Sequence, residues 1–250
     1  MATILIGVAW VTHATLRALS APRPSRPTLE SMANTLQEPK VVTVLDRMYA
    51  ETRDQMSRLR ELHGDFDRPM SAQERADAMS EFYIPVTPEA GRLLYALVRA
   101  TRPTTVVEFG MSFGISAIHL ASALRDNGIG RVVTTELSAT KIAAAKQTFA
   151  ETGLADVITI LEGDALTTLA DLDGPVDFIL LDGWKDLYLP VIKLLEPRLE
   201  TGALVVADNT NAADTPPYLD RVRNPDNGYV SFNFLVRDSD SMEISCRTGD

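Results

Sequence analysis

Short apolar runs and helical segments alternate between residues 105 and 207, and this alternation constrains the fold more than any other feature of the chain. The apolar runs, rich in β-branched residues, cover residues 105–109, 131–135, 157–161, 176–181 and 203–207. Helical segments separate them, as at residues 115–125 and after the helix cap Ser138. Strands that alternate with helices in this way form a parallel sheet covered on both faces. The sequence therefore predicts an α/β fold with a doubly wound sheet.

The segments on either side of this region follow other patterns. Apolar residues recur at helical spacing over residues 40–62, residues 71–74 have the form of a capping box, and Thr87 caps a helix that begins with proline. Residues 229–236 and 242–246 flank a polar stretch typical of a hairpin turn. We expect a mostly parallel, Rossmann-like sheet of seven strands with a C-terminal antiparallel hairpin and N-terminal helices.

Residues 1–28 differ in sequence pattern from the rest of the chain. Their apolar run from Ile4 to Val11 is too short to span a bilayer and has no basic region before it. Alternating prolines then indicate an extended linker. We expect a flexible leader at 1–28 and a single domain at 29–250, with a helical part at 29–100 and an α/β core at 101–250. Stable membrane insertion is not expected, and a membrane address is the alternative reading.

Composition excludes several classes of function. The formal net charge of −10 argues against non-specific binding to nucleic acid, which needs clustered Lys and Arg. The single cysteine, Cys246, excludes an intrachain disulfide and a cysteine-based zinc site. A reduced, cytoplasmic setting follows as the default. The histidines His13, His63 and His119 lack the spacing of metal ligands, and we expect none to be catalytic.

Acidic residues follow three successive predicted strands, at the edge where an open parallel sheet binds its ligands. Glu108 lies at the end of the first strand, Glu136 closes the second, and Asp164 comes shortly after the third. An acid in the position of Glu136 can accept both hydroxyls of a ribose. A nucleotide-like ligand is therefore predicted, and the alternative is that these acids are only solvated strand ends.

The glycine spacing after the first strand narrows the choice of ligand. A dinucleotide site has the pattern Gly-x-Gly-x-x-Gly, which places a pyrophosphate on a helix N-terminus. Here three residues separate Gly110 from Gly114, and Glu108 precedes them. Such a loop favours a cationic ligand with an amino group over a pyrophosphate. A nicotinamide-dependent oxidoreductase is thus the competing hypothesis.

A second polar group follows the fourth and fifth predicted strands. Asp182 and Lys185 come after one strand, and Asp208 and Asn209 after the next. Two carboxylates and an amide oxygen match a hard cation such as Mg²⁺. A bound cation disfavours the protonated form of a neighbouring lysine, which suits Lys185 to general-base catalysis. The alternatives are that Lys185 is a surface lysine, and that the chain is a non-catalytic binding module.

At these residues the sequence resembles the cation-dependent O-methyltransferases, the catechol O-methyltransferase-like family, from about Tyr83 to Ala213. Residues 182–188, Asp-Gly-Trp-Lys-Asp-Leu-Tyr, are similar to that family's Asp-x-Trp-Lys-Asp-x-Tyr segment, and Asp208-Asn209 matches its second metal motif. The resemblance implies the methyltransferase variant of the fold, S-adenosylmethionine as cofactor, a divalent metal such as Mg²⁺ and a small hydroxylated acceptor of aromatic or catechol-like type. It also implies a homodimer, and a metal-independent methyltransferase is a further alternative.

The resemblance implies roles for individual residues. Asp182, Asp208 and Asn209 would hold the metal, and Lys185 would remove the proton of the acceptor hydroxyl. The residues expected around the cofactor are Val86, Thr87, Glu108, Gly110, Gly114, Ser116, Glu136, Asp164 and Asp182. One departure concerns the acceptor: the family has an acid near the C-terminal strands that orients a second hydroxyl, and Val236 aligns with it here. A catechol is therefore expected only as one possible acceptor.

Overall fold

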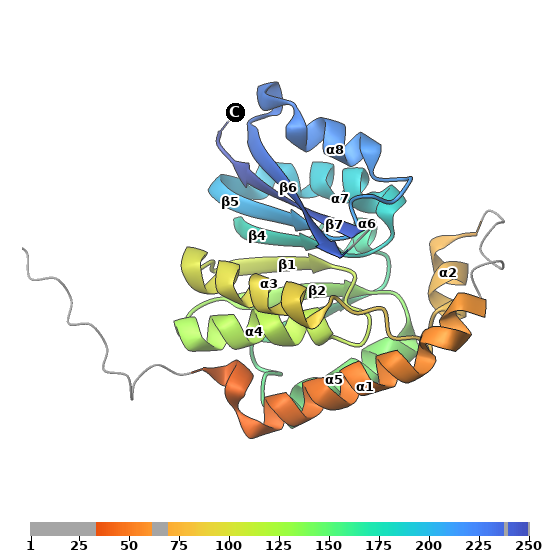
Figure 1. Cartoon of the computed structure of the whole chain (residues 1–250). Coiled ribbons are helices and arrows are strands. Elements are labelled where there is room, and N and C mark those ends of the chain that lie inside the picture. Colours follow the sequence, from red (N-terminus) through yellow and green to blue (C-terminus); the bar gives the residue numbers. More distant parts are fainter. Residues whose placement is uncertain (1–33, 62–69, 238–239, 250) are drawn as a thin grey trace, which may run out of the picture. The chain divides into compact units, whose positions relative to one another are not determined.

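The computed structural model describes residues 34–61, 70–237 and 240–249. Seven strands form one sheet in the order β3-β2-β1-β4-β5-β7-β6 (Figure 1). The strands are β1 (Thr105–Phe109), β2 (Arg131–Glu136), β3 (Ile158–Glu162), β4 (Val176–Leu181), β5 (Leu199–Ala207), β6 (Tyr229–Arg237) and β7 (Asp240–Arg247). The first five run parallel, and β7 pairs antiparallel with both β5 and β6. The predicted sheet with its C-terminal antiparallel hairpin is confirmed.

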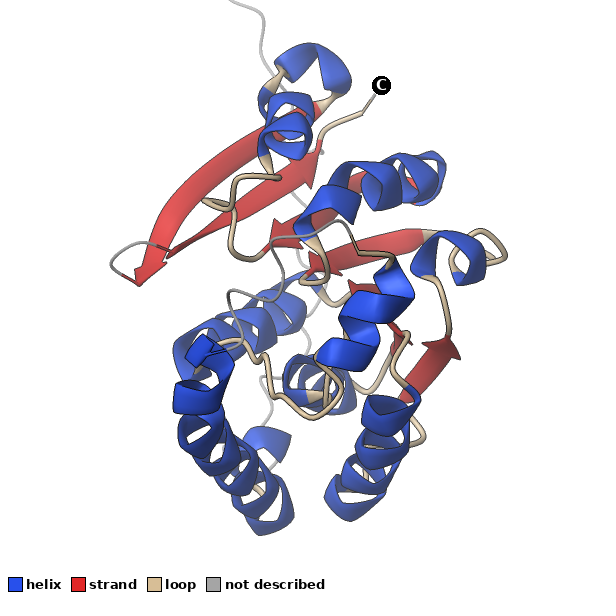
Figure 2. Ribbon diagram, turned by 90° about the vertical axis from the view of Figure 1, so that its right-hand side faces the viewer, coloured by secondary structure: helices blue, strands red, loops and turns tan. Residues whose placement is uncertain are grey.

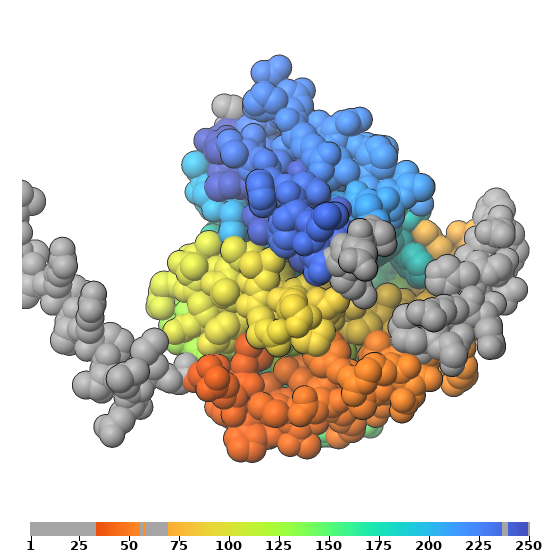
Figure 3. Space-filling view, in the orientation of Figure 1, coloured from red at the N-terminus to blue at the C-terminus, as the bar shows by residue number. Residues whose placement is uncertain are grey.

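Helices cover both faces of this sheet (Figure 2). The α-helices are α1 (Pro39–Glu61), α2 (Ala72–Ala78), α3 (Pro88–Thr101), α4 (Ile115–Asn127), α5 (Ala139–Thr152), α6 (Ala165–Thr168), α7 (Tyr188–Leu195) and α8 (Pro216–Arg223). Short 3₁₀ helices are η2 (Thr35–Gln37), η4 (Lys185–Leu187), η5 (Glu196–Arg198) and η6 (Pro225–Asn227). In the space-filling view, α1, α3 and the C-terminal segment form successive bands of one surface (Figure 3).

Two hydrophobic clusters fill the space between the sheet and its helices. Neighbouring residues of a strand belong to different clusters, as Val106 and Val107 of β1 do, because successive side chains point to opposite faces. One cluster contains residues of α1, α3, α4 and α5, and the other contains residues of α6, α7 and α8. Strands buried on both faces explain the continuous apolar runs in the sequence.

The helix caps predicted from sequence are present. Ser71 and Glu74 form a reciprocal capping box at α2, and the Thr87 side chain accepts a hydrogen bond from Ala90 N at the start of α3. After β4, helix α7 ends at Leu195 and the chain continues as the 3₁₀ helix η5, which contains Pro197. Proline lacks the backbone N–H that a continuing α-helix needs.

Some expectations fall on residues outside the described ranges. The predicted leader at 1–28, His13, His63 and the turn at Asp238 belong to this group. Within the described ranges, no helix is both long and apolar enough to cross a bilayer.

Candidate active site

A cavity of about 280 Å³ lies at the edge of the sheet where the parallel strands end. It lies at the switch point of the topology, where β1 has β2 on one side and β4 on the other. Six of the predicted site residues line it: Gly110, Glu136, Asp164, Asp182, Lys185 and Asn209. The sheet thus brings together residues from five separate strand ends.

The loop after β1 approaches the loop after β4 very closely. Gly110 has φ +98°, and a Cβ atom there would lie 2.6 Å from the backbone of Gly183. The glycine is therefore required both by its conformation and by the neighbouring backbone. Gly114, at the start of α4, faces Phe149 instead, since a Cβ atom there would lie 2.5 Å from that ring.

Glu136, at the end of β2, has its carboxylate satisfied by the backbone. Its Oε2 atom accepts a hydrogen bond from Ser112 N at 2.8 Å. Its Oε1 atom accepts from Leu137 N and Ser138 N, each at 2.8 Å. These bonds fix the carboxylate and tie the loop after β1 to the end of β2.

Lys141, on α5, lines the cavity beside Glu136 and was not predicted from the sequence. Its Nζ atom donates to the Ser112 hydroxyl at 3.2 Å and lies 5.5 Å from the centre of the Phe113 ring. Burial lowers the pKa of this lysine to about 8. A lysine on a helix is normally exposed, so the sequence contains no signal for its burial.

Other residues predicted to bind the cofactor are not among those that line the cavity. Glu108 is fully buried, accepts a hydrogen bond from the Thr134 hydroxyl, and has its pKa raised by burial to about 7. Ser116 lines a small recess next to the loop after β1, together with Ile84 and Pro85. Val86 and Thr87 are at the beginning of α3, where Val86 is buried.

The loops after β4 and β5 bring two carboxylates together in a buried position. Burial raises the pKa of Asp182 well above its usual range, and the nearby Asp208 raises it further. Lys185 opposes this effect, with its Nζ atom 3.6 Å from Asp182 Oδ1. The same Nζ donates to the Tyr188 hydroxyl at 2.7 Å, and this hydroxyl donates to the backbone oxygen of Asp208 at 3.0 Å. Tyr188 thus connects the two loops.

Asn209 reaches toward the C-terminal hairpin. It has φ +52°, a left-handed conformation that asparagine tolerates better than most residues. Its Nδ2 atom donates to Asp240 Oδ2 at 2.8 Å. Sequence alignment placed Val236 where an acid was sought, but the structure brings Asp240 of β7 to Asn209.

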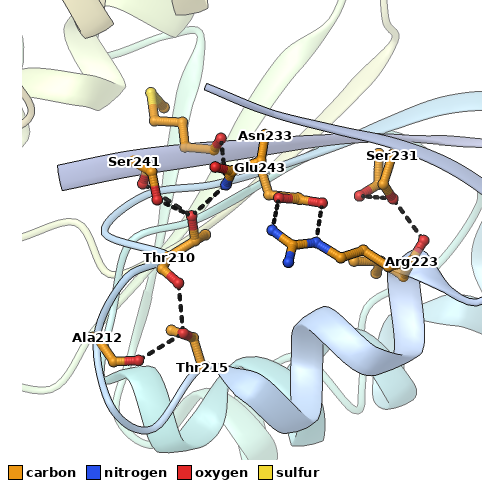
Figure 4. A network of polar contacts seen from close by, with 11 residues as sticks. Thr210, Ala212, Thr215, Arg223, Ser231, Asn233, Ser241 and Glu243 are labelled. Atoms are coloured by element: carbon orange, nitrogen blue, oxygen red, sulfur yellow. Dashed lines mark hydrogen bonds and ion pairs between the residues drawn. The ribbon is translucent and has the colours of Figure 1, made fainter. Parts of the chain in front are cut away.

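The residues after Asn209 are anchored to the hairpin by a polar network (Figure 4). Thr210 N donates to Ser241 O at 2.9 Å, and Asn233 Nδ2 donates to the Thr210 hydroxyl at 3.0 Å. The Thr215 hydroxyl donates to Thr210 O at 2.7 Å. The hairpin therefore holds the loop that carries Asp208 and Asn209. Strand patterns in the sequence do not reveal this structural role.

The described part of the chain contains no group of three or more His, Cys, Asp or Glu side chains arranged to hold a metal ion. The possible donors at this edge are instead two carboxylates and one amide. Oxygen donors of this kind suit a hard cation that keeps water or substrate in its other positions.

Comparisons with known proteins agree with this geometry. Residues 107–210 match the model of a family described as a methyltransferase domain. The catechol O-methyltransferase B of Danio rerio is 31% identical over 198 residues, which cover 74% of each chain. The catechol O-methyltransferase of Mus musculus is 32% identical, and the match covers 62% of each chain. The solved structure of an O-methyltransferase from Bacillus cereus in complex with SAH has a TM-score of 0.60 at 20% identity, covering 80% of this chain and 100% of that one.

Proposed function

This chain belongs to the cation-dependent O-methyltransferase family and is an S-adenosylmethionine-dependent O-methyltransferase, and we propose that it methylates a hydroxyl of a small, catechol-like aromatic molecule. The observation that carries the proposal is that Asp182, Lys185 and Asn209, which follow β4 and β5, line the same cavity as Glu136, which ends β2 on the other side of β1. The part of the cavity after β4 and β5, called the metal wall below, has groups that can remove a proton. The part at the ends of β2 and β3, called the cofactor wall below, has acids that can bind the hydroxyls of a nucleoside.

A divalent metal such as Mg²⁺ fits the oxygen donors of the residues after β4 and β5. Asp208 is buried and the Asp182 side chain is 10% exposed, and Asp208 raises the pKa of Asp182, so a cation held by both would relieve their repulsion. We propose that these two carboxylates and the amide oxygen of Asn209 hold the ion. When bound, such an ion lowers the pKa of an acceptor hydroxyl.

Lys185 is the proposed general base. The Tyr188 hydroxyl, 2.7 Å from its Nζ atom, and Asp182 at 3.6 Å fix the position of this side chain at the cavity wall. In its neutral form Lys185 takes the proton of the acceptor hydroxyl. The acceptor oxygen then forms a bond to the methyl carbon as the carbon–sulfur bond breaks, and SAH leaves. Holding oxygen, carbon and sulfur in line supplies much of the rate enhancement.

The cofactor is proposed to lie across the ends of β1, β2 and β3. Glu136 would accept hydrogen bonds from the ribose hydroxyls, and Asp164 would lie toward the adenine. Around the methionine end we place Val86, Thr87, Glu108, Gly110, Gly114, Ser116 and Asp182. Support comes from Gly110, Glu136, Asp164 and Asp182, which all line the same cavity.

Calorimetry and a methyl-transfer assay test the proposal together. Metal-stripped protein is titrated with S-adenosylmethionine and with NAD, and transfer to a panel of catechols is measured with and without Mg²⁺. We expect S-adenosylmethionine to bind and transfer to depend on Mg²⁺. Transfer that is insensitive to chelator would leave a metal-independent methyltransferase, and binding of NAD in place of S-adenosylmethionine would contradict the whole assignment.

We also propose a homodimer in a reduced, cytoplasmic setting. Strand β6 is the last strand of the sheet, and its Val230, Phe232 and Leu235 side chains are exposed. An apolar edge strand of this kind is a surface that a second copy could cover. Light scattering after size-exclusion chromatography would give twice the chain mass for wild type, and Phe232→Ser should shift it toward the monomer. A wild-type monomer at all concentrations would contradict the dimer.

A further inference from the structure

Arg75 connects helix α2 to the segment that carries Lys185. Its Nη1 and Nη2 atoms donate to the two carboxylate oxygens of Asp186, at 2.9 and 3.1 Å. The centre of its guanidinium group also lies 4.7 Å from the centre of the Trp184 ring. Arg75 therefore contacts the residues on both sides of Lys185, across 111 positions of sequence.

Helix α2 is also part of the cavity wall. Ala72, Ala76 and Met79 line the cavity together with Trp184 and Lys185. A helix of seven residues is too short to be stable by itself, so tertiary contacts determine where α2 lies. The position of this wall relative to Lys185 thus depends on contacts such as those of Arg75.

We propose that Arg75 is a positioning residue for the methyl acceptor, because it fixes the distance between α2 and the Trp184–Asp186 segment. Ala72 and Ala76 line the cavity with short side chains, and we place the ring of the acceptor between them and Lys185. The inference rests on the proposed function for the class of acceptor. It assigns the acceptor end of the cavity to α2, away from Glu136 and the residues proposed to bind the cofactor.

The geometry requires arginine in particular. A planar guanidinium can pair with both carboxylate oxygens while one of its faces covers an aromatic ring, and a lysine ammonium cannot do both in this way. Asp186 has a side chain 45% exposed, so the ion pair alone contributes little. The stacking on Trp184 adds to it, and we expect the two contacts together to change acceptor affinity about tenfold.

Trp184 provides a direct signal for the contact. The chain has two tryptophans, Trp10 and Trp184, so Trp10→Phe leaves Trp184 as the sole source of indole fluorescence. In this background we would prepare Arg75→Ala, Arg75→Lys and Asp186→Asn. The matched control is Arg92→Ala, which removes an exposed arginine–glutamate pair on α3. Catechol binding is followed by Trp184 emission, and KM, kcat and the Kd for S-adenosylmethionine are measured for each variant.

For Arg75→Ala we expect a changed Trp184 emission and a rise of about tenfold in both the catechol Kd and the acceptor KM. The Kd for S-adenosylmethionine and kcat at saturation should stay within about twofold of wild type, since Arg75 contacts Trp184 and Asp186, whereas Glu136 is held by backbone groups of residues 112, 137 and 138. Arg75→Lys should recover part of the loss, Asp186→Asn should show a smaller one, and Arg92→Ala should show none.

Two results would overturn the inference. In the first, Trp184 emission changes in Arg75→Ala while the catechol Kd and the acceptor KM do not. In the second, acceptor KM, cofactor Kd, kcat and melting temperature all deteriorate together, which would indicate general destabilisation. If wild-type protein transfers no methyl group, the proposed function fails, but catechol binding measured through Trp184 still decides the role of Arg75. Absence of any catechol binding would contradict both the proposed function and the proposed role of Arg75.

Discussion

Carboxylates stand on both walls of the cavity, but their surroundings differ. Glu136, on the proposed cofactor wall, accepts three hydrogen bonds from backbone N–H groups. Asp182, on the proposed metal wall after β4, has a side chain that is 10% exposed, and its pKa is raised by burial and by the nearby Asp208 carboxylate. The backbone therefore stabilises one negative charge, whereas the fold holds the other two charges together at a cost.

This contrast distinguishes a carboxylate whose charge is stabilised by the protein backbone from a pair of carboxylates that needs a proton or a cation. A carboxylate held by backbone donors is already ordered, so it loses little further conformational entropy when it binds the neutral hydroxyls of a ligand. A buried carboxylate pair is stable only when protonated, paired with a cation or bound to a metal. The two walls should consequently respond to mutation, pH and metal in different ways.

The largest effect is expected from Asp208→Ala. Loss of one carboxylate from the proposed metal site should lower kcat/KM with Mg²⁺ by about 10³-fold or more, because the activation of the acceptor hydroxyl is lost. The Kd for S-adenosylmethionine, measured by calorimetry, should change less than about twofold, since Glu136 is untouched. The exposed Asp173→Ala is the control. Full activity and an unchanged Mg²⁺ response in Asp208→Ala would contradict the metal assignment.

A smaller loss is expected when the proposed base is removed. Lys185→Ala should lower kcat about 10²-fold, the usual contribution of a general base. Lys185→Arg should not restore the rate, because a guanidinium keeps its proton. Single-turnover methyl transfer measures this step, with the exposed Lys193→Ala on α7 as control. Recovery of wild-type kcat in the arginine variant would exclude proton removal by residue 185.

On the cofactor wall we expect an effect on binding. Glu136→Gln should weaken S-adenosylmethionine about thirtyfold, because hydrogen bonds to a charged group are worth about 1.5–3 kcal/mol. At saturating cofactor the rate should be nearly normal. Calorimetry of this variant beside Glu162→Gln, which changes an exposed acid paired with Lys146, makes the comparison. A large fall in kcat with unchanged cofactor affinity would reverse the roles of the two walls.

The smallest effect concerns stability without metal. Asp182 has a pKa in the folded protein above its unfolded value of about 3.9, so metal-free stability should fall as pH rises through the interval between these two values. Asp182→Asn removes that slope and should raise the free energy of unfolding at pH 7 by about 1 kcal/mol in urea titrations with chelator. A variant less stable than wild type, with an unchanged pH slope, would show that Asp182 is not under repulsion.

Features of the fold that depend on local sequence were predictable. The strands, the caps at Ser71 and Thr87, and the placement of acids at strand ends follow from residue pattern alone. The sheet then places Glu136, Asp164 and Asp182 around one cavity, as an open parallel sheet must. Their roles toward ligands stay predictions.

Contacts between distant segments were not predictable in this way. The pairing of Arg75 with Asp186 and of Asn209 with Asp240 requires knowing which elements lie side by side. The position of an acid near Val236 was also not predictable, because β6 shifts register against β7 between Leu235 and Arg237. A bulge changes which residues face the partner strand, so counting along a strand fails beyond it.

The close approach of Gly110 and Gly183 has a consequence for how new activities could arise. A Cβ atom at Gly110 would lie 2.6 Å from the Gly183 backbone, and one at Gly183 would lie 2.5 Å from the Phe109 ring. The close packing of these two glycines therefore sets the spacing between the two loops, and substitutions of side chains cannot change that spacing in small steps. Directed evolution toward other acceptors should accordingly accumulate its changes in α2, while this pair of glycines stays fixed.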